Sequence, residues 1–175
     1  LNSAGDASYD IFIASINSST GTWNWVKSVG NSGTDMATSI TSMSDGRAAV
    51  VGKVACCSLN FDSISTSGSH YGNFDGFIAI IDKDGNWEAV EIIGASIYGD
   101  HFQDISIDSN GDFNLIGLFQ GTSIKHESGE KAIASISNPV TAVMKLNSEL
   151  DVKWISIFEG TEGVYPMDIS STSGG

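Results

Sequence analysis

The stretch Asp75-Gly76-Phe77-Ile78-Ala79-Ile80-Ile81-Asp82 occurs, in varied form, three times in this chain of 175 residues. An earlier copy reads Asp10-Ile11-Phe12-Ile13-Ala14-Ser15-Ile16-Asn17, and a weaker copy covers residues 142–147. The copies recur about every 65 residues, and self-similarity at a fixed period of this size is typical of proteins built from repeated structural units. We therefore expect one repeat domain over residues 1–175, with repeat 1 at about 9–73, repeat 2 at about 74–138 and a partial repeat 3 at about 139–175.

Short strands and tight turns account for most of each repeat. Polar and apolar residues alternate in segments such as 39–43 and 104–108, and each segment runs into a turn with Asp45-Gly46 or Asn110-Gly111. This pattern is typical of β-hairpins, and no stretch shows the period of a helix. Each repeat thus predicts four short antiparallel strands. The positions expected in the core are Phe12, Ile40, Val50, Phe77, Ile105 and Ile116.

Four strands in a unit too small to bury its own faces is the organisation of a propeller blade. The expected fold class is all-β, with β-propeller-like blades of four-stranded antiparallel sheets in an incomplete propeller. The motifs DIFIASIN, DGFIAIID, SDGRAAVVGKV and SNGDFNLIGLF resemble the bacterial and archaeal seven-bladed β-propeller repeats (SBBP-like repeats) over nearly the whole chain. That resemblance implies a propeller fold and an exported setting, and it implies no catalytic residues.

The sequence departs from that family pattern in two places. Ala142 stands where the other copies have Phe12 and Phe77, and Cys56-Cys57 stands where the second repeat has Gly121-Thr122. Adjacent cysteines can close only a strained vicinal disulfide. We expect instead two thiols that pack as small apolar groups.

The number of repeats bears on assembly. A propeller closes with about four to eight blades, and this sequence carries at most three. The chain is therefore interpreted either as a fragment of a longer propeller or as one of several chains that close a ring. Because bare strand edges recruit neighbouring chains, we expect a homo-oligomer, with the contact at the face carrying Trp154 and Ile169 or near Leu1.

The charge balance excludes two kinds of partner. Eight Lys and Arg residues against 21 Asp and Glu residues give a net charge of −13. Such a chain is a poor ligand for nucleic acid, whose phosphates require Lys and Arg, and for anionic membrane surfaces. The sequence contains no apolar run of about 18 residues, the length that a membrane-spanning helix requires. We expect an acidic extracellular or cell-surface protein, whose export signal is not in this chain.

Two turns contain oxygen ligands at alternate positions. They are Asp82-Lys83-Asp84-Gly85-Asn86 and Asp108-Ser109-Asn110-Gly111-Asp112, so Asp82, Asp84, Asp108 and Asp112 are candidate calcium ligands. Neither turn continues to the distal Glu of a twelve-residue calcium loop, and Asp-Gly and Asn-Gly also satisfy a tight hairpin turn. We favour the hairpin interpretation. No cofactor other than calcium is indicated.

Aromatic and repeated acidic residues are the candidates for ligand contact. Trp23 and Trp25 lie two apart and are expected on one face of a strand, where they either stack on a ligand or fill the space between blades. Asp35 and Asp100 are separated by one period and either bind turn N–H groups or line the central face of the propeller. The three histidines are not related to one another by the period, and no nucleophile elbow is present, so no catalytic residue is predicted.

These patterns predict a non-enzymatic extracellular or cell-surface repeat module for protein interaction or adhesion. The alternative is a carbohydrate- or calcium-binding propeller domain that accompanies a secreted enzyme. The expected partner is accordingly a protein or a glycan.

Overall fold

The computed structural model describes residues 9–31, 33–55, 59–66, 71–95, 99–133, 138–161 and 163–172. Within these ranges the chain forms strands, turns and bends, with no helix, as the sequence predicts. A membrane-spanning helix is accordingly not found among the described residues. Cys56, Cys57 and His70 lie outside these ranges, as does the strand expected near Leu1.

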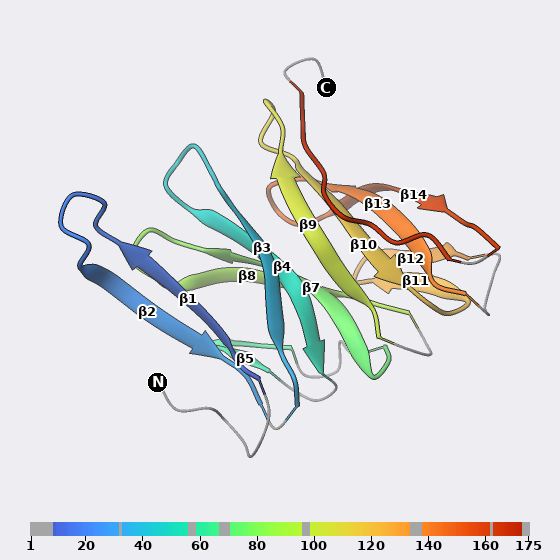
Figure 1. The fold of residues 1–175 in the computed structure, drawn as a ribbon, viewed down its shortest axis with the longest axis horizontal. Coiled ribbons are helices and arrows are strands. Elements are labelled where there is room, and N and C mark those ends of the chain that lie inside the picture. Colours follow the sequence, from blue (N-terminus) through green and yellow to red (C-terminus); the bar gives the residue numbers. More distant parts are fainter. Residues whose placement is uncertain are drawn as a thin grey trace.

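Two four-stranded antiparallel sheets form most of the molecule (Figure 1). Sheet I has the order β3 (Met36–Ser42), β4 (Ala48–Ala55), β7 (Phe74–Ile81), β8 (Trp87–Ile93). Sheet II has the order β9 (His101–Ile107), β10 (Phe113–Phe119), β13 (Val140–Leu146), β14 (Val152–Phe158). This is the all-β, propeller-like architecture expected from the sequence, and neither sheet closes on itself.

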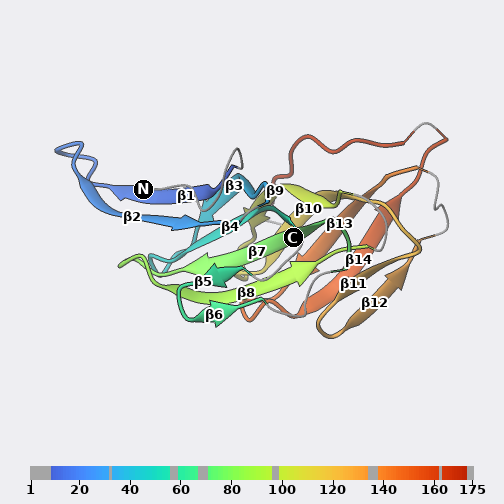
Figure 2. The ribbon, with the colours of Figure 1, turned by 90° about the horizontal axis from the view of Figure 1, so that it is seen from below.

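Smaller two-stranded sheets accompany these two. The N-terminal ribbon consists of β1 (Ile11–Ile16) and β2 (Trp23–Val29) and lies beside sheet I. A hairpin joins the second and third strands of each large sheet. These are β5 (Asn60–Phe61) with β6 (Ile64–Ser65), and β11 (Ser123–His126) with β12 (Gly129–Ala132). Both hairpins lie near β8 in the view from below (Figure 2), and Lys125 of β11 exchanges two backbone hydrogen bonds with Gly94.

The strands of sheet II follow those of sheet I at the spacing seen in the sequence. β3 and β9 begin at Met36 and His101, and β4 and β10 begin at Ala48 and Phe113. Each sheet takes its first two strands from one sequence copy and its last two from the next. The period determines the spacing of equivalent strands, but it does not determine at which residue a sheet begins. The repeat bounds near residues 73 and 138 therefore fall inside the two sheets.

Side chains of the first strands connect the sheets at this same spacing. The Ser39 hydroxyl lies 2.5 Å from an Asp104 carboxylate oxygen, and the other oxygen of Asp104 accepts the Ile169 N–H at 2.9 Å. The hydroxyls of Ser106 and Ser171 are 2.8 Å apart. In each of these pairs the partners are separated by one period. β3, β9 and segment 168–172 thus form a row of equivalent segments.

Two apolar clusters hold the sheets together. One lies between sheets I and II and contains Ile78, Phe102, Phe113, Leu115 and Phe119 among others. The other lies between the N-terminal ribbon and sheet I and includes Ile11, Ile13, Phe61, Phe77 and Trp87. The core is therefore made of contacts between successive sheets.

The expected core positions divide by their place in this stack. Val50, Phe77 and Ile105 are buried, and Ile116 is half-buried. The prediction is wrong for Phe12 and Ile40, which are 62% and 56% exposed. Their counterparts one period later, Phe77 and Ile105, are covered by a neighbouring sheet or ribbon, whereas no described strand covers Phe12 and Ile40.

Candidate functional site

The first calcium candidate is a turn held by its own side chains. One oxygen of Asp82 accepts the N–H groups of Asp84 and Asn86 at 2.8 Å each, and the other accepts the Asn86 amide at 2.9 Å. The hydrogen bonds from Asn86 hold the pKa of Asp82 below its usual range. Asp84 points elsewhere, toward the Lys83 ammonium at 2.6 Å. Gly85 has φ of 86°, the left-handed geometry that such a turn needs.

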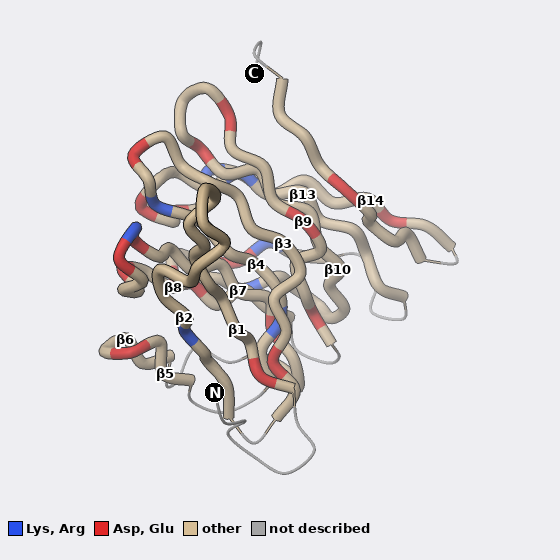
Figure 3. The backbone as a smooth tube through the Cα atoms, turned by 60° about the vertical axis from the view of Figure 1, so that its left-hand side comes forward, with Lys and Arg blue, Asp and Glu red and all other residues tan. Residues whose placement is uncertain are grey.

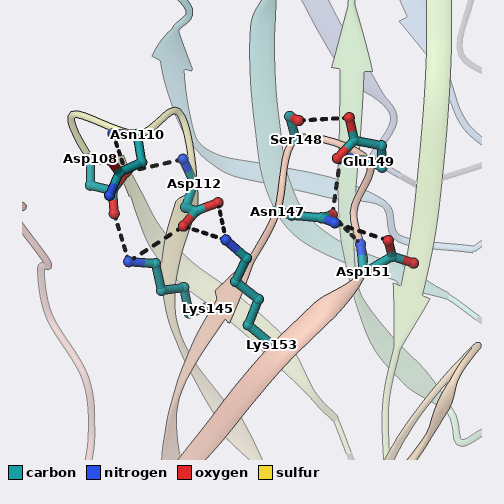
Figure 4. Close-up of polar contacts among 9 residues, drawn as sticks. All are labelled: Asp108, Asn110, Asp112, Lys145, Asn147, Ser148, Glu149, Asp151 and Lys153. Carbon is teal, nitrogen blue, oxygen red and sulfur yellow. Dashed lines mark hydrogen bonds and ion pairs between the residues drawn. The ribbon is translucent and has the colours of Figure 1, made fainter.

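The second candidate turn is filled by lysine ammonium groups (Figure 4). One oxygen of Asp108 accepts the N–H groups of Asn110 at 2.8 Å and Asp112 at 3.1 Å. The other lies 2.6 Å from the Lys145 Nζ, which holds the pKa of Asp108 below its usual range. The Lys153 Nζ lies 2.6 Å from both oxygens of Asp112. Two ammonium groups thus neutralise the carboxylates that a calcium ion would use.

The ion pairs of Asp108 and Asp112 with Lys145 and Lys153, here called the lysine network, are replaced by other residue types at the equivalent positions of sheet I. Asp112 and Lys153 correspond, one period earlier, to Arg47 and Glu88, whose guanidinium and carboxylate are 3.2 Å apart. The same ion pair is therefore present with its charges exchanged. Asp108 and Lys145 correspond to Met43 and Ile80, both buried in the cluster between sheets I and II. The network thus takes the structural place of an ion pair and an apolar contact.

Metal ligands do not gather elsewhere in the described part of the chain. No group of three or more His, Cys, Asp or Glu side chains there is placed to hold an ion. The turn of Asn147, shown beside the lysine network in Figure 4, repeats the Asp82 geometry with an amide. Its Oδ1 accepts the N–H groups of Glu149 and Asp151 at 3.1 and 2.8 Å. Calcium binding stays a prediction, with hairpin geometry accounting for the same residues.

Asp35 and Asp100 bind backbone groups at equivalent places. Asp35 is fully buried and accepts the N–H groups of Asn31 at 3.0 Å and Ala55 at 2.8 Å. Asp100 is also fully buried and accepts the N–H groups of Ala95 and, at 2.8 Å, Gln120.

Asp35 therefore links the chain just after β2 to the end of β4, and Asp100 links the chain just after β8 to the end of β10. Burial raises the pKa of Asp100 to about 7, against the lowering effect of its two N–H donors. Of the two alternatives stated from the sequence, the observed contacts are those with backbone N–H groups. A buried carboxyl of this kind has no surface left for a ligand.

Trp23 and Trp25 do not share a face, contrary to the expectation from their spacing. The register of β1 with β2 shifts between Ser15, opposite Trp25, and Ile16, opposite Trp23, so Asn24 forms a bulge. An extra residue in one strand reverses the alternation of side chains. Trp25 packs against sheet I and donates its Nε1–H to the Lys83 carbonyl at 2.8 Å. Trp23 lies on the other side and is 60% exposed.

An apolar groove lies beside Trp23. Its volume is about 400 Å³, and it runs between β1 and the first two strands of sheet I. We call it the N-terminal groove; its lining residues are Phe12, Ile13, Ala14, Ile16, Trp23, Ala37, Thr38, Ser39, Ile40 and Val50. It collects most of the large apolar side chains that are exposed at this end of the molecule.

A second apolar surface lies at the opposite end of the stack. Trp154 and Phe158 of β14 are 46% and 53% exposed and form what we call the C-terminal face. The residue that corresponds to Phe158 in sheet I, Ile93, is fully buried between sheets I and II. Ile169 binds Asp104 through its N–H, beside β9 rather than on β14.

Sequence reasoning missed an acidic depression near β8. Glu91 is 7% exposed and accepts the Glu127 N–H at 2.8 Å, and the depressions on either side are lined by Tyr71, Glu127, Glu149 and Asp151 among others. Burial, with the charges of Glu127 and Asp151, raises the pKa of Glu91 to about 7. Glu91 lies in an ordinary strand pattern. The equivalent positions in the strand register are occupied by Lys27 and Ser156, so the acidic residue is not repeated.

The histidines within the described ranges show no catalytic arrangement. His101 is half-buried at the start of β9, and burial lowers its pKa. His126 is half-buried, lies 3.1 Å from the Ser128 hydroxyl through its Nδ1, and also has its pKa lowered by burial. Neither lies within the N-terminal groove or on the C-terminal face.

Comparison with known proteins adds no assignment. Neither the models of known protein families nor the curated proteins give a significant match to this sequence.

Proposed function

We propose that this chain is a non-enzymatic repeat module of the propeller type that works by protein contact in an extracellular or cell-surface setting. One observation carries the proposal: the apolar side chains exposed at the two ends of the stack occupy positions that are buried between units in its middle. Phe12 corresponds to buried Phe77, and Phe158 corresponds to buried Ile93. Large apolar patches on soluble proteins usually mark contact surfaces.

The charge distribution supports the same proposal. Asp and Glu positions are spread over turns and strand ends, with few Lys and Arg positions among them (Figure 3). The N-terminal groove has no charged residue in its lining. An apolar centre with charges outside it is the usual anatomy of a protein interface. The preferred partner is another unit of the same kind, because its faces already fit one another inside this molecule.

The alternative, a carbohydrate-binding domain, has less support. A sugar site needs hydrogen-bonding groups placed beside a stacking ring. Exposed Trp23 supplies a ring, but its neighbours in the groove are chiefly Phe12, Ile16, Ile40 and Val50, with Thr38 and Ser39 as the hydroxyl-bearing residues. The groove therefore suits an apolar partner better than a sugar.

Sedimentation velocity over a range of protein concentrations tests the proposal. We expect the wild-type chain to associate, and added salt to strengthen association because it screens the net charge of −13. Phe158→Asp should weaken association, whereas Tyr165→Asp, at an exposed aromatic position on neither surface, should not. A wild-type chain that stays monomeric at every concentration and salt level would contradict self-contact as the function.

A further inference from the structure

The inner edge of β1 has no partner strand among the described residues. Among the described strands, β1 pairs only with β2, whereas its counterparts β7 and β13 are paired on both sides. β7 pairs with β4 as well as β8, and β13 pairs with β10 as well as β14. The position beside β1 that corresponds to β4 and β10 has no described strand. Open edges of this kind present unpaired N–H and C=O groups to a further strand.

The N-terminal groove lies at that same position. Phe12, Ala14 and Ile16 of β1 line one side, and Ile40 of β3 and Val50 of β4 line the other. Ile40 is 56% exposed, whereas its counterpart in sheet II, Ile105, is 5% exposed. A ready hydrogen-bonding edge and an unfilled apolar groove thus coincide.

We propose that this groove accepts one extended apolar strand that pairs antiparallel with β1, as β4 pairs with β7 and β10 with β13. The occupant is an extended polypeptide segment with the side-chain pattern of those two strands. This inference deepens the proposed function, on which it rests, by naming the chemistry of the partner and its mode of binding. Addition of a strand to an exposed sheet edge is an established mode of peptide recognition.

The pattern of β10 defines what the groove should select. Phe113, Leu115 and Phe119 alternate along the strand and are fully buried toward sheet I, whereas Asn114 and Ile116 are half-buried on its other side. In the register of β10 with β13, Phe113 lies opposite Leu146 and Leu115 opposite Met144. The same register beside β1 places the first of these rings opposite Ile16 and the leucine opposite Ala14. Because residues opposite one another in an antiparallel pair point to the same face, these two side chains would lie beside Phe12, Ala14 and Ile16. The side chains at the positions of Asn114 and Ile116 would then face Ile40 and Val50.

A synthetic peptide with the sequence of residues 111–120 is the probe for this inference. We expect saturable binding by isothermal titration calorimetry and a blue shift of tryptophan emission, because the peptide carries no Trp and Trp23 lines the groove. The same peptide with Leu115→Pro should not bind, since proline removes one strand N–H and cannot continue the ladder.

Matched variants of the protein locate the binding. Ile40→Asp places a charge in the groove at a position 56% exposed, so the fold should tolerate it and peptide affinity should fall at least about tenfold. Tyr165→Asp makes the same kind of change at a position 66% exposed outside the groove and should leave affinity unchanged. Circular dichroism of both variants should match the wild type.

Several results would overturn the inference. They are absence of saturable binding, equal binding of the proline peptide, and binding that Ile40→Asp leaves intact. One further result would overturn it: Ile40→Asp dissociates an oligomer, but the peptide does not dissociate the wild-type oligomer. A folded second copy, rather than an extended strand, would then cover the groove. That last result would retain the proposed function. Conversely, a wild-type chain that is always monomeric but binds the peptide would contradict self-contact and retain the strand site.

Discussion

Replacing Phe12 and Phe77 separately by Ala should give very different losses of stability. The two residues are one period apart and occupy the same place in β1 and β7, yet they are 62% and 0% exposed. Phe77 packs against Phe61 with ring centroids 5.9 Å apart. A phenylalanine side chain buries about 200 Å² when fully enclosed, so 62% exposure leaves roughly 120 Å² less buried at Phe12.

At about 25 cal/mol per Å² that difference corresponds to about 3 kcal/mol. Phe77→Ala also leaves a cavity, so we expect it to cost about 4 kcal/mol and Phe12→Ala about 1 kcal/mol. Urea unfolding followed by circular dichroism and tryptophan fluorescence, at low protein concentration, measures both free energies of unfolding. Ile105→Ala and Ile40→Ala form a second pair, in which the buried residue, Ile105, should again give the larger loss of stability.

Equal losses for Phe12→Ala and Phe77→Ala at low protein concentration would refute this reasoning, because they would mean that Phe12 is buried within the monomer. A large loss for Phe12→Ala that appears only at high concentration has a different meaning. It would show that another copy covers the N-terminal groove, since association stabilises a folded chain by mass action.

Three further predictions concern charged groups. Asp112→Arg and Lys153→Glu should each destabilise the chain, while the double variant, which copies the Arg47–Glu88 pair, should recover most of the loss; a double-mutant cycle should give a coupling of roughly 0.5–1 kcal/mol. The folded-state pKa values of Glu91 and Asp100, each about 7, are above those of the unfolded chain, so the folded state holds extra protons and the melting temperature should fall as pH rises from about 5 to about 8. Glu91→Gln should reduce this slope and leave the part due to Asp100, and an unchanged slope would contradict the role of Glu91. Millimolar calcium should leave the melting temperature nearly unchanged, and a rise of several degrees abolished by Asp112→Ala would show that the turn binds the ion.

Local patterns determined the parts of this protein that depend on neighbours in sequence. Alternation of apolar residues and the Asp-Gly and Asn-Gly turns predicted strands and hairpins because side-chain direction in a strand and positive φ at a turn are local properties. Gly85 and Gly111 have the φ values of 86° and 82° that such turns require. The period of the sequence likewise predicted which strands are equivalent.

Bulges were not visible in the sequence, and they changed the interpretation of the tryptophans. The bulge at Asn24 moved Trp23 and Trp25 to opposite faces, and register shifts at the same place recur between β7 and β8 and between β13 and β14. A bulge depends on how two strands pair rather than on the alternation within either one. Spacing in the sequence alone therefore could not assign Trp25 to the core and Trp23 to the groove.

The sequence by itself determined the strand class, the turns and the period of this protein, because these follow from local backbone and side-chain preferences. Only the tertiary structure decided which copy of each apolar position is buried, since burial depends on whether another sheet lies against it. Phe12 and Phe77 have the same local pattern and opposite exposure for this reason. Packing also decided that Lys145 and Lys153 meet Asp108 and Asp112, because side chains so far apart in the sequence become neighbours only when β10, β13 and β14 align.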